Sequence, residues 1–402
     1  MTWAKRRLAD VAELSLGKML DLKKNRGAPR PYLANVNVRW GSFDLSDLRE
    51  MRFEPHENER YGLRRGDIVM CEGGEPGRCA IWRDQVSGMM LQKALHRVRA
   101  KAGLDAEFLF YCLFHQGRSG ALEHLFTGAT IKHLPGEQLA KVEVPVPPPS
   151  TQRRIASILG AYDDLIEVNR RRIALLEEMA RRLFEEWFVH FRFPGHESVR
   201  MEETPEGPLP EGWHRVILGE VAENFDRLRK PLSKPQRQGM RGPYPYYGAA
   251  KIFDHLDSYL FDGLYLLVAE DGSVVTDEGY PVLQLADGRF WVNNHAHVIR
   301  GATPVSTEFL YLALARYPVR GHITGAAQPK ITQASLNRIP LVIAPAEVME
   351  HFNTKAQDLI GLGLRLGSAN DKLAASRDLL LPRLISGDLS VTTAERELEA
   401  AA

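Results

Sequence analysis

The chain has 402 residues, of which 44% are hydrophobic and 26% charged. That is enough material for two or three domains, each with a core of its own. No apolar run approaches the roughly 18 residues needed to span a bilayer. The opening segment MTWAKRRLADVAEL becomes acidic and amphipathic too early for a secretory signal. These features exclude a membrane span or a signal peptide, and we expect a cytoplasmic protein.

The net charge and the cysteines give two further indications, the location of the positive charge and the state of the thiols. The formal net charge is only +1, but residues 1–150 carry 23 Lys and Arg against 18 Asp and Glu, so the excess of positive charge lies in the first part of the chain. The three cysteines, Cys71, Cys79 and Cys112, are odd in number and irregularly spaced. This indicates buried, reduced thiols rather than a disulfide framework or a zinc site.

Self-comparison indicates a duplicated unit of about 200 residues. The segment LADVAEL at residues 8–14 matches LGEVAEN at residues 218–224, and the later matches follow in the same order with slowly drifting offsets. These later matches are Glu107-Phe108-Leu109 with Glu308-Phe309-Leu310, His96 and Arg99 with His297 and Arg300, Gly128-Ala129 with Gly325-Ala326, and Leu139 with Leu336. Each unit combines about 150 residues of short strands and a few helices with one long helix, which predicts an α+β protein.

The boundaries of this organisation follow from composition. We expect a first globular domain over 1–149, a long helix over 150–193, a second globular domain over 194–345, and a second long helix with its tail over 346–402. Antiparallel packing of the two helices would give a pseudo-two-fold arrangement of two α/β domains joined by a coiled coil.

The first long helix is predicted to begin after Pro147-Pro148-Pro149, with Ser150 or Thr151 as its N-cap. Its apolar residues form two heptad rows of the kind found in a coiled coil. These rows are Ile155, Tyr162, Asn169, Leu176 and Leu183, and Leu159, Ile166, Ile173, Ala180 and Trp187. Asn169 is either a tolerated polar residue or one that fixes the register of the helices.

The second long helix repeats the pattern less strongly. Phe352, Leu359, Leu366, Leu373 and Leu380 recur every seven residues. Gly361, Gly363 and Gly367 each disfavour a helix by about 1 kcal/mol relative to Ala. We expect a bend near Gly363 and a close approach of the first helix at these small residues.

The whole order of segments resembles the DNA-specificity subunits of type I restriction-modification enzymes. LFEEWFVHFRFPG, at the end of the first helix, resembles the central conserved region of that family, and RDLLLPRLISGDLSV resembles its distal conserved region. LPEGWHRVILGEVAE resembles the start of a target-recognition domain. Four further segments resemble the interior of a target-recognition domain. In the second half of the chain these are YPYYGAAKIFDHLDSYLFDGLYLLVAEDGS and WVNNHAHVIRG, and in the first half they are GDIVMCEGGEPGRCAIW and LQKALHRVRA.

The resemblance implies a division of labour. Each globular domain would read one half of a split double-stranded DNA target, and the helices would set the spacing and dock two modification subunits. Those subunits would bind S-adenosylmethionine and methylate adenine, and two restriction subunits would use ATP and Mg²⁺. The chain itself would hold no cofactor, bind no membrane and catalyse no reaction.

Catalytic signatures are not evident in the sequence. It has no phosphate-binding G-x-x-x-x-G-K-[ST] motif, no Asn-Pro-Pro-Tyr or Asp-Pro-Pro-Tyr motif and no G-x-S-x-G motif. Glu72-Gly73-Gly74 and Glu270-Asp271-Gly272 are predicted to be turns. His295 and His297 are predicted to form hydrogen bonds from a strand, because no third metal ligand accompanies them.

Residues that contact DNA are expected in two loops that share a position in the repeat but not a sequence. Base edges are read by Arg, Lys, Asn and Gln, and phosphates are bound by Lys and Arg. A second pair of candidates lies at the shared Gly-Ala turn. The predicted DNA-binding residues are Lys23, Lys24, Arg26, Arg30, Asn35, Asn37, Arg39 and Lys132 in the first domain, and Lys234, Arg237, Gln238, Arg241, Tyr246, Gln328 and Lys330 in the second.

Two other hypotheses stay open from sequence alone. The chain could be an orphan two-domain DNA-binding or scaffold protein without methyltransferase partners. It could also be an enzyme in which carboxylates such as Glu270 act in a cleft. A neighbouring adenine-methyltransferase gene would favour the main hypothesis, and methyl transfer or ATP hydrolysis by the chain alone would favour the enzyme.

Overall fold

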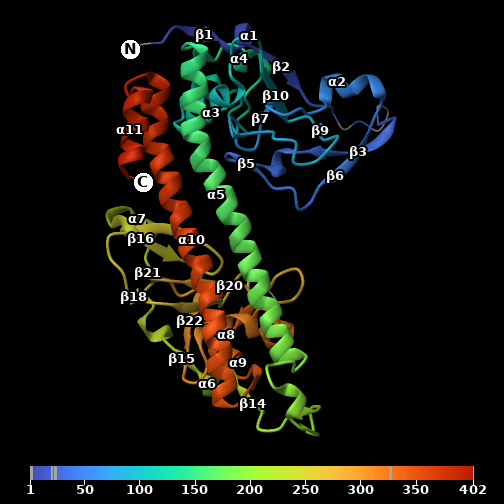
Figure 1. Ribbon diagram of the computed structural model, residues 1–402, viewed down its shortest axis with the longest axis vertical. Helices are drawn as coiled ribbons and strands as arrows, with labels where there is room; N and C mark the ends of the chain where they lie inside the picture. Colours follow the sequence, from blue (N-terminus) through green and yellow to red (C-terminus); the bar gives the residue numbers. More distant parts are fainter. Residues whose placement is uncertain (1–2, 20, 22–24, 326–327, 402) are drawn as a thin grey trace. The chain divides into compact units, whose positions relative to one another are not determined.

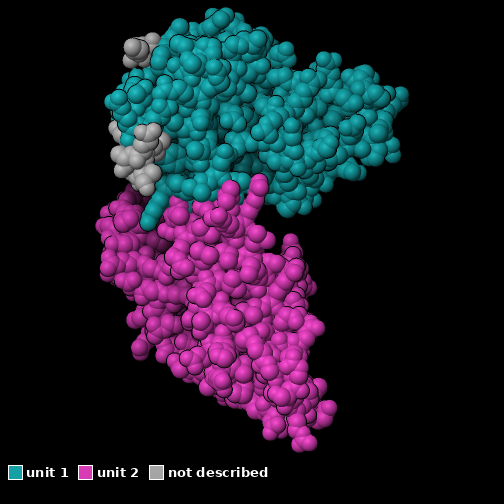
Figure 2. Space-filling view, viewed as in Figure 1, with its two compact units in different colours: residues 1–167, 370–402 teal, residues 168–369 magenta. Residues whose placement is uncertain are grey.

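The computed structural model describes residues 3–19, 21, 25–325 and 328–401. The chain forms two compact units, drawn in different colours in Figure 2. Unit 1 contains residues 1–167 and 370–402, and unit 2 contains residues 168–369. Both units mix helices and strands, so the predicted α+β class is confirmed. No helix in the described ranges has the length and apolar character needed to cross a membrane.

Unit 1 is built around an antiparallel four-stranded sheet. Its strands, in order across the sheet, are β2 (Ala12–Leu16), β10 (Leu95–Ala100), β7 (Ile68–Cys71) and β8 (Cys79–Ile81). Every residue of β7 is buried, as expected for an inner strand covered on both faces. Helix α3 (Ala106–Arg118) packs on the sheet, and its first turn is capped by the Asp105 carboxylate, which accepts from the Phe108 N–H.

A smaller sheet lies beside this one in unit 1, with a separate core of Tyr32, Met51, Phe53 and Met90. Its strands, in order, are β6 (Arg49–Phe53), β3 (Ala28–Leu33) and β9 (Met90–Leu91). The remaining elements before the long helix are β1 (Lys5–Arg7), α1 (Leu8–Val11), β4 (Val38–Arg39), β5 (Ser42–Phe43), α2 (Asn58–Tyr61), α4 (Gly136–Leu139) and β11 (Glu143–Pro145).

Unit 2 repeats this arrangement, and many of the elements of both units are labelled in Figure 1. Its main sheet has the strands β15 (Ala222–Asn224), β22 (Ala296–Gly301), β19 (Tyr265–Ala269) and β20 (Leu283–Ala286). Its smaller sheet has the strands β17 (Ile252–Leu256), β16 (Arg241–Tyr247), β21 (Arg289–Val292) and β18 (Phe261–Asp262). The other elements are β12 (Met201–Glu202), β13 (Leu209–Pro210), β14 (His214–Ile217), α6 (Leu218–Val221), α7 (Lys234–Gly239), α8 (Thr307–Leu314), β23 (Ile323–Thr324), β24 (Lys330–Ile331), α9 (Gln333–Asn337) and β25 (Pro340–Ile343).

The register of the strands confirms the duplication at the level of single residues. His96 pairs with Met70 in the main sheet of unit 1, and His297 pairs with Val268 at the equivalent place in unit 2. The Ser306 hydroxyl caps α8 by accepting from the Phe309 N–H, as Asp105 caps α3. The two halves of the sequence therefore fold on the same scaffold.

The first long helix, α5 (Pro149–Phe184), continues into a π-helical turn over Glu185–Val189. Pro149 is its first residue, so the prediction that Ser150 or Thr151 caps the helix from outside is wrong. Proline is favoured at a first helical position because its fixed φ suits the helix and its missing N–H would have no partner there. The second long helix, α10 (Ala346–Ser386), is followed by α11 (Val391–Ala401).

The predicted heptad rows supply residues to both cores. In unit 1, Ile155 and Leu159 of α5 share a core with Leu384 of α10. In unit 2, Ala180 of α5 shares a core with Phe352 of α10. The boundary between the compact units falls inside both long helices, so the predicted division into two domains and two separate helical segments stays a prediction.

The sequence predicts two roles for the glycines of α10, a bend near Gly363 and a close approach of the first helix, and the bend stays a prediction. The helix runs without interruption from Ala346 to Ser386. A Cβ atom built on Gly363 or on Gly367 would meet no other atom of the described chain within 4 Å. The prediction that these residues permit a close approach of the first helix is therefore wrong.

Candidate nucleic-acid interface

Three segments far apart in the sequence meet at one end of the main sheet of unit 1. The loop after β7 forms a bridge from Gly73 to His133, and the Leu134 N–H donates to the Glu72 carbonyl at 2.7 Å. On the other side of this loop, the Asn35 side-chain nitrogen lies 3.0 Å from the position that a Cβ atom on Gly74 would occupy. The fold therefore gathers the predicted residue Asn35 and the hairpin that carries Lys132.

Glu75 holds this loop in place. Its carboxylate accepts from the Trp40 indole and from the Arg78 guanidinium, both at 2.7 Å. Arg78 also donates to the Asn35 carbonyl at 3.0 Å. The side-chain amide of Asn35 has no hydrogen-bond partner among the described residues, and it stays available to an outside ligand.

The equivalent place in unit 2 is built in the same way. Asp271 forms a bridge to Lys330, and the Ile331 N–H donates to the Glu270 carbonyl at 2.9 Å. The hairpins of both units begin with a glycine in the left-handed region, Gly128 with φ +92° and Gly325 with φ +85°. The predicted turns at Glu72 and Glu270 are thus confirmed as loops that support these two hairpins.

The side chains around the loop of unit 2 form a charged network. The Glu270 carboxylate accepts from Arg229 at 2.5 Å and from Lys330 at 2.9 Å. Burial opposes ionisation of Glu270, but the hydrogen bonds from Arg229 and Lys330 outweigh it and hold the pKa of this carboxyl below its usual range. The hydrogen bond to Glu270 raises the pKa of Lys330 in turn. Lys330 is therefore already paired.

His297 adds a second carboxylate to this network. Its Nδ1 lies 2.6 Å from the Asp226 carboxylate, and its Nε2 lies 2.8 Å from the Ile331 carbonyl. Asp226, Glu270 and His297 offer donor atoms within 4.8 Å of one another, which is the spacing of a metal site. Arg229, however, lies against both carboxylates, so the cluster is already compensated by positive charge. His295 bonds separately to Asp271 at 2.7 Å.

The match of His96 with His297 in the sequence corresponds to a shared contact. The Nε2 atom of each lies 2.8 Å from a carbonyl at the base of its hairpin, that of Leu134 in unit 1 and that of Ile331 in unit 2. Burial lowers the pKa of His96, although this hydrogen bond opposes the shift. Both histidines therefore fix a loop from inside the fold.

Apart from Asn35 and Lys330, described above, and Arg30, described below, the predicted DNA-binding residues divide into three groups. Lys23 and Lys24 lie outside the described residues. Six are exposed, and their side chains form no hydrogen bond or ion pair within the described chain, so these side chains are available to a ligand. These six are Arg26, Lys132, Lys234, Gln238, Arg241 and Gln328.

The third group has contacts inside the protein. Asn37 is only 6% exposed, and its amide donates to the Asp44 and Asp47 carbonyls. Tyr246 is 2% exposed, and its hydroxyl accepts from the Leu232 N–H. Their burial and internal hydrogen bonds argue against contact with DNA, and their assignment as DNA contacts stays a prediction. Loop polar groups need partners too, and sequence alone does not reveal which are satisfied internally.

Arg39 and Arg237 have local partners but keep some exposure. Arg39 donates to the Val36 carbonyl and to Asp44, and its side chain is half exposed. Arg237 donates to the Leu232 carbonyl and lies over the ring of Tyr246. Their assignment as DNA contacts stays a prediction.

Sequence reasoning missed Arg229, which neutralises the loop of unit 2, and Arg289, which lies on the smaller sheet. Both lie outside the two loops chosen for their composition. The alignment of the repeat could have found Arg289, because it stands 201 positions after Gly88, the same offset as His96 and His297.

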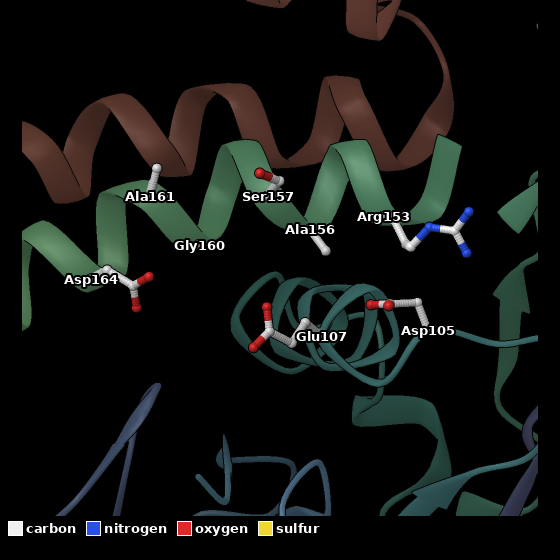
Figure 3. Close-up of a pocket in the computed structure, with 8 residues that line it drawn as sticks. All are labelled: Asp105, Glu107, Arg153, Ala156, Ser157, Gly160, Ala161 and Asp164. Atoms are coloured by element: carbon white, nitrogen blue, oxygen red, sulfur yellow. The ribbon is translucent and has the colours of Figure 1, made fainter. Parts of the chain in front are cut away.

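A separate hollow of about 360 Å³ lies in unit 1 between α3 and α5 (Figure 3). Its charged lining consists of three carboxylates and one guanidinium, from Asp105, Glu107, Asp164 and Arg153. Arg83 also pairs with Asp164 at 2.7 Å and with Glu107 at 3.6 Å. Carboxylates outnumber guanidinium groups here, so we do not assign the hollow to the candidate interface.

Comparison with known proteins gives a consistent result. A family model described as "Type I restriction modification DNA specificity domain" matches residues 1–178 and 210–360. The type I restriction enzyme MjaIX specificity subunit of Methanocaldococcus jannaschii is 22% identical over 97% of this chain and 94% of its own length. A putative type I restriction enzyme specificity subunit of Haemophilus influenzae, S.HindORF215P, is 39% identical over 33% of each chain.

A solved structure is similar over almost the whole chain. The crystal structure of the S subunit of a type I restriction-modification system from M. genitalium superimposes with a TM-score of 0.58 and 15% identity. The similarity covers 96% of this chain and 96% of that one. It establishes the common fold.

Proposed function

The chain belongs to the family of type I restriction modification DNA specificity domains, and we propose on this basis that it selects the DNA sequence on which a type I restriction-modification complex acts. Each unit reads one half of a bipartite target. The chain carries no catalytic site and binds no cofactor. Methyl transfer from S-adenosylmethionine and ATP-dependent cleavage belong to partner subunits.

One observation carries this proposal: the same loop and hairpin are built twice, with different exposed side chains. Unit 1 presents the exposed Lys132 and the half-buried Asn35, whereas unit 2 presents Gln328 beside a paired Lys330. A scaffold that is kept while its exposed residues change is what two readers of different sequences need. Direct reading of bases depends on such exposed Asn, Gln, Arg and Lys side chains.

Exposed apolar residues on helix α5 support the proposed docking of modification subunits. In unit 2 it exposes Val168, Leu175 and Met179, at spacings of seven and four residues, with Leu175 64% exposed. This is the spacing of a coiled-coil seam, and it lies on a different face from the buried Asn169 and Ala180. We propose that helices of two modification subunits pack on the long helices and that two restriction subunits join this assembly.

The test is to map methylated adenines in the DNA of cells that carry the gene and of cells that lack it. We expect a motif with two specified halves separated by unspecified bases, present only with the gene. A continuous motif would contradict the reading of one half by each unit. Methylation that is the same in both strains would contradict a role in modification and would favour an orphan DNA-binding protein.

A further inference from the structure

The smaller sheets of the two units place one pair of residues in equivalent positions. Strand β3 runs parallel to β9 with Tyr32 opposite Met90, and β16 runs parallel to β21 with Tyr246 opposite Trp291. Side chains two residues apart on a strand share a face. Two residues earlier, Tyr244 stands beside Arg289 in unit 2, and in unit 1 Arg30 lies beside Gly88, which is in the turn before β9.

In unit 1 the guanidinium comes from β3. The Nη1 atom of Arg30 lies 2.9 Å from the position that a Cβ atom on Gly88 would occupy. Gly88 has φ +69°, a backbone conformation that suits glycine. The side chain of Arg30 forms no hydrogen bond or ion pair with any residue that the structure describes, so no carboxylate compensates its charge at short range.

In unit 2 the guanidinium comes from the opposite strand. Arg289, at the position of Gly88, donates to the Asp262 carboxylate at 3.1 Å and lies over the ring of Tyr259 at 5.0 Å. Its side chain is 53% exposed. A hydrogen bond with the Tyr244 side chain, together with the one to Asp262, raises the pKa of Arg289.

The two units thus keep an arginine at the same pair of positions but supply it from different strands. The surrounding frame is also kept, since Arg30 lies between Pro29 and Pro31 as Tyr244 lies between Pro243 and Pro245. Ion pairing within the fold does not explain why both units have an arginine at this place. Asp262 is an exposed partner of the kind that contributes little to stability, and Arg30 has no carboxylate partner in the described chain.

We propose that this arginine, Arg30 in unit 1 and Arg289 in unit 2, binds a phosphate of the DNA backbone next to each half of the target. The proposal rests on the proposed function. A guanidinium can grip either phosphate oxygens or the edge of a guanine. A phosphate fits better, because units that read different bases share only the backbone, and phosphate contacts position the protein regardless of sequence.

The experiment measures binding of target DNA by the complex assembled with its modification subunits, over a series of salt concentrations. We expect Arg30→Ala and Arg289→Gly each to weaken binding about tenfold at low salt and to reduce the slope of log K against log salt by about one. The methylation motif found on a randomised target library should stay unchanged. Arg192→Ala removes an exposed arginine that is paired with Glu186 and belongs to neither of the smaller sheets, so it should change neither quantity.

A double variant that moves the arginine to the other strand distinguishes a loss of phosphate binding from a loss of folding. The double variant Tyr244→Arg with Arg289→Gly gives unit 2 the arrangement of unit 1, and it should recover the affinity and the salt slope that Arg289→Gly loses. Unchanged salt slopes in both single variants, or no recovery in the double variant, would overturn the proposal. A motif that relaxes at one base pair would show a guanine contact instead and would also overturn it. Failure of the proposed function looks different, because then the unaltered complex itself has no bipartite motif.

Discussion

Asp163 of α5 and Arg377 of α10 form an ion pair in unit 1, although 214 positions separate them in the sequence. The same Asp163 carboxylate accepts from the Tyr111 hydroxyl of α3 at 2.6 Å. The Arg377 guanidinium also donates to Asp378 and lies over the ring of Phe114. One carboxylate therefore joins the two long helices to the helix that covers the main sheet.

We expect Asp163→Ala to lower the free energy of unfolding by about 3 kcal/mol. The variant leaves the buried Arg377 without one of its two carboxylates and the buried Tyr111 hydroxyl without its acceptor, and breaking a buried pair costs about 3–5 kcal/mol. Urea unfolding of the purified chain measures this. The neighbouring Asp164 is exposed and pairs only at the surface with Arg83, so Asp164→Ala should cost less than about 1 kcal/mol. Equal losses in the two variants would contradict this ranking.

Replacing Gly363 or Gly367 by alanine should stabilise the protein by about 0.5–1 kcal/mol each. Both lie inside α10 with open space where the methyl group would go, and alanine lowers the conformational entropy of the unfolded chain. Thermal unfolding measures the gain. Gly117, inside α3, is the control, because a Cβ there would lie 2.6 Å from the Gly77 carbonyl oxygen. Gly117→Ala should be destabilising, and a loss of stability at Gly363 would mean that this face is packed.

The stability of unit 1 should fall as the pH is lowered through about 6.5, the usual pKa of histidine. Burial lowers the pKa of His96 in the folded state, so below pH 6.5 the unfolded chain takes up a proton that the folded chain does not. The contribution is therefore fully present above pH 6.5 and is lost towards the lower pKa of the folded state. Urea unfolding at several pH values should show a smaller slope for His96→Gln, which cannot titrate. An identical slope would show that His96 is not its source.

Asn35 and Asn37 provide a matched pair for the candidate interface. Asn35→Ala removes an amide without an internal partner, so we expect it to relax one base pair in one half of the motif, by about 1–3 kcal/mol, with little change in stability. Asn37→Ala removes the hydrogen bonds to the Asp44 and Asp47 carbonyls, so it should lower stability by about 1–3 kcal/mol. Methylation of a randomised target library by the assembled complex, and urea unfolding, distinguish the two. A relaxed motif in the other half would contradict the assignment of unit 1.

The sequence by itself determined the class of fold, the duplication and the two long helices. These features depend on patterns that are local in the chain or repeated along it: heptad rows such as Leu159 and Ile166, the helix start at Pro147-Pro148-Pro149, and the match of His96 with His297. Local periodicity decides which face of a helix is apolar, and a repeated pattern folds into a repeated scaffold. The same patterns carried the resemblance to the specificity family.

The tertiary structure alone decided which polar side chains face outward and which are satisfied within the fold. Asn35 and Asn37 are the same residue type two positions apart, yet one is free and the other is bonded to two carbonyls. The equivalence of Arg30 with Arg289 likewise exists only in the register of two parallel strands. Hydrogen-bond partners and cross-strand neighbours are set by contacts between residues distant in sequence, and burying an unpaired polar group is costly. These contacts therefore fix the candidate interface, whereas the sequence could indicate only its neighbourhood.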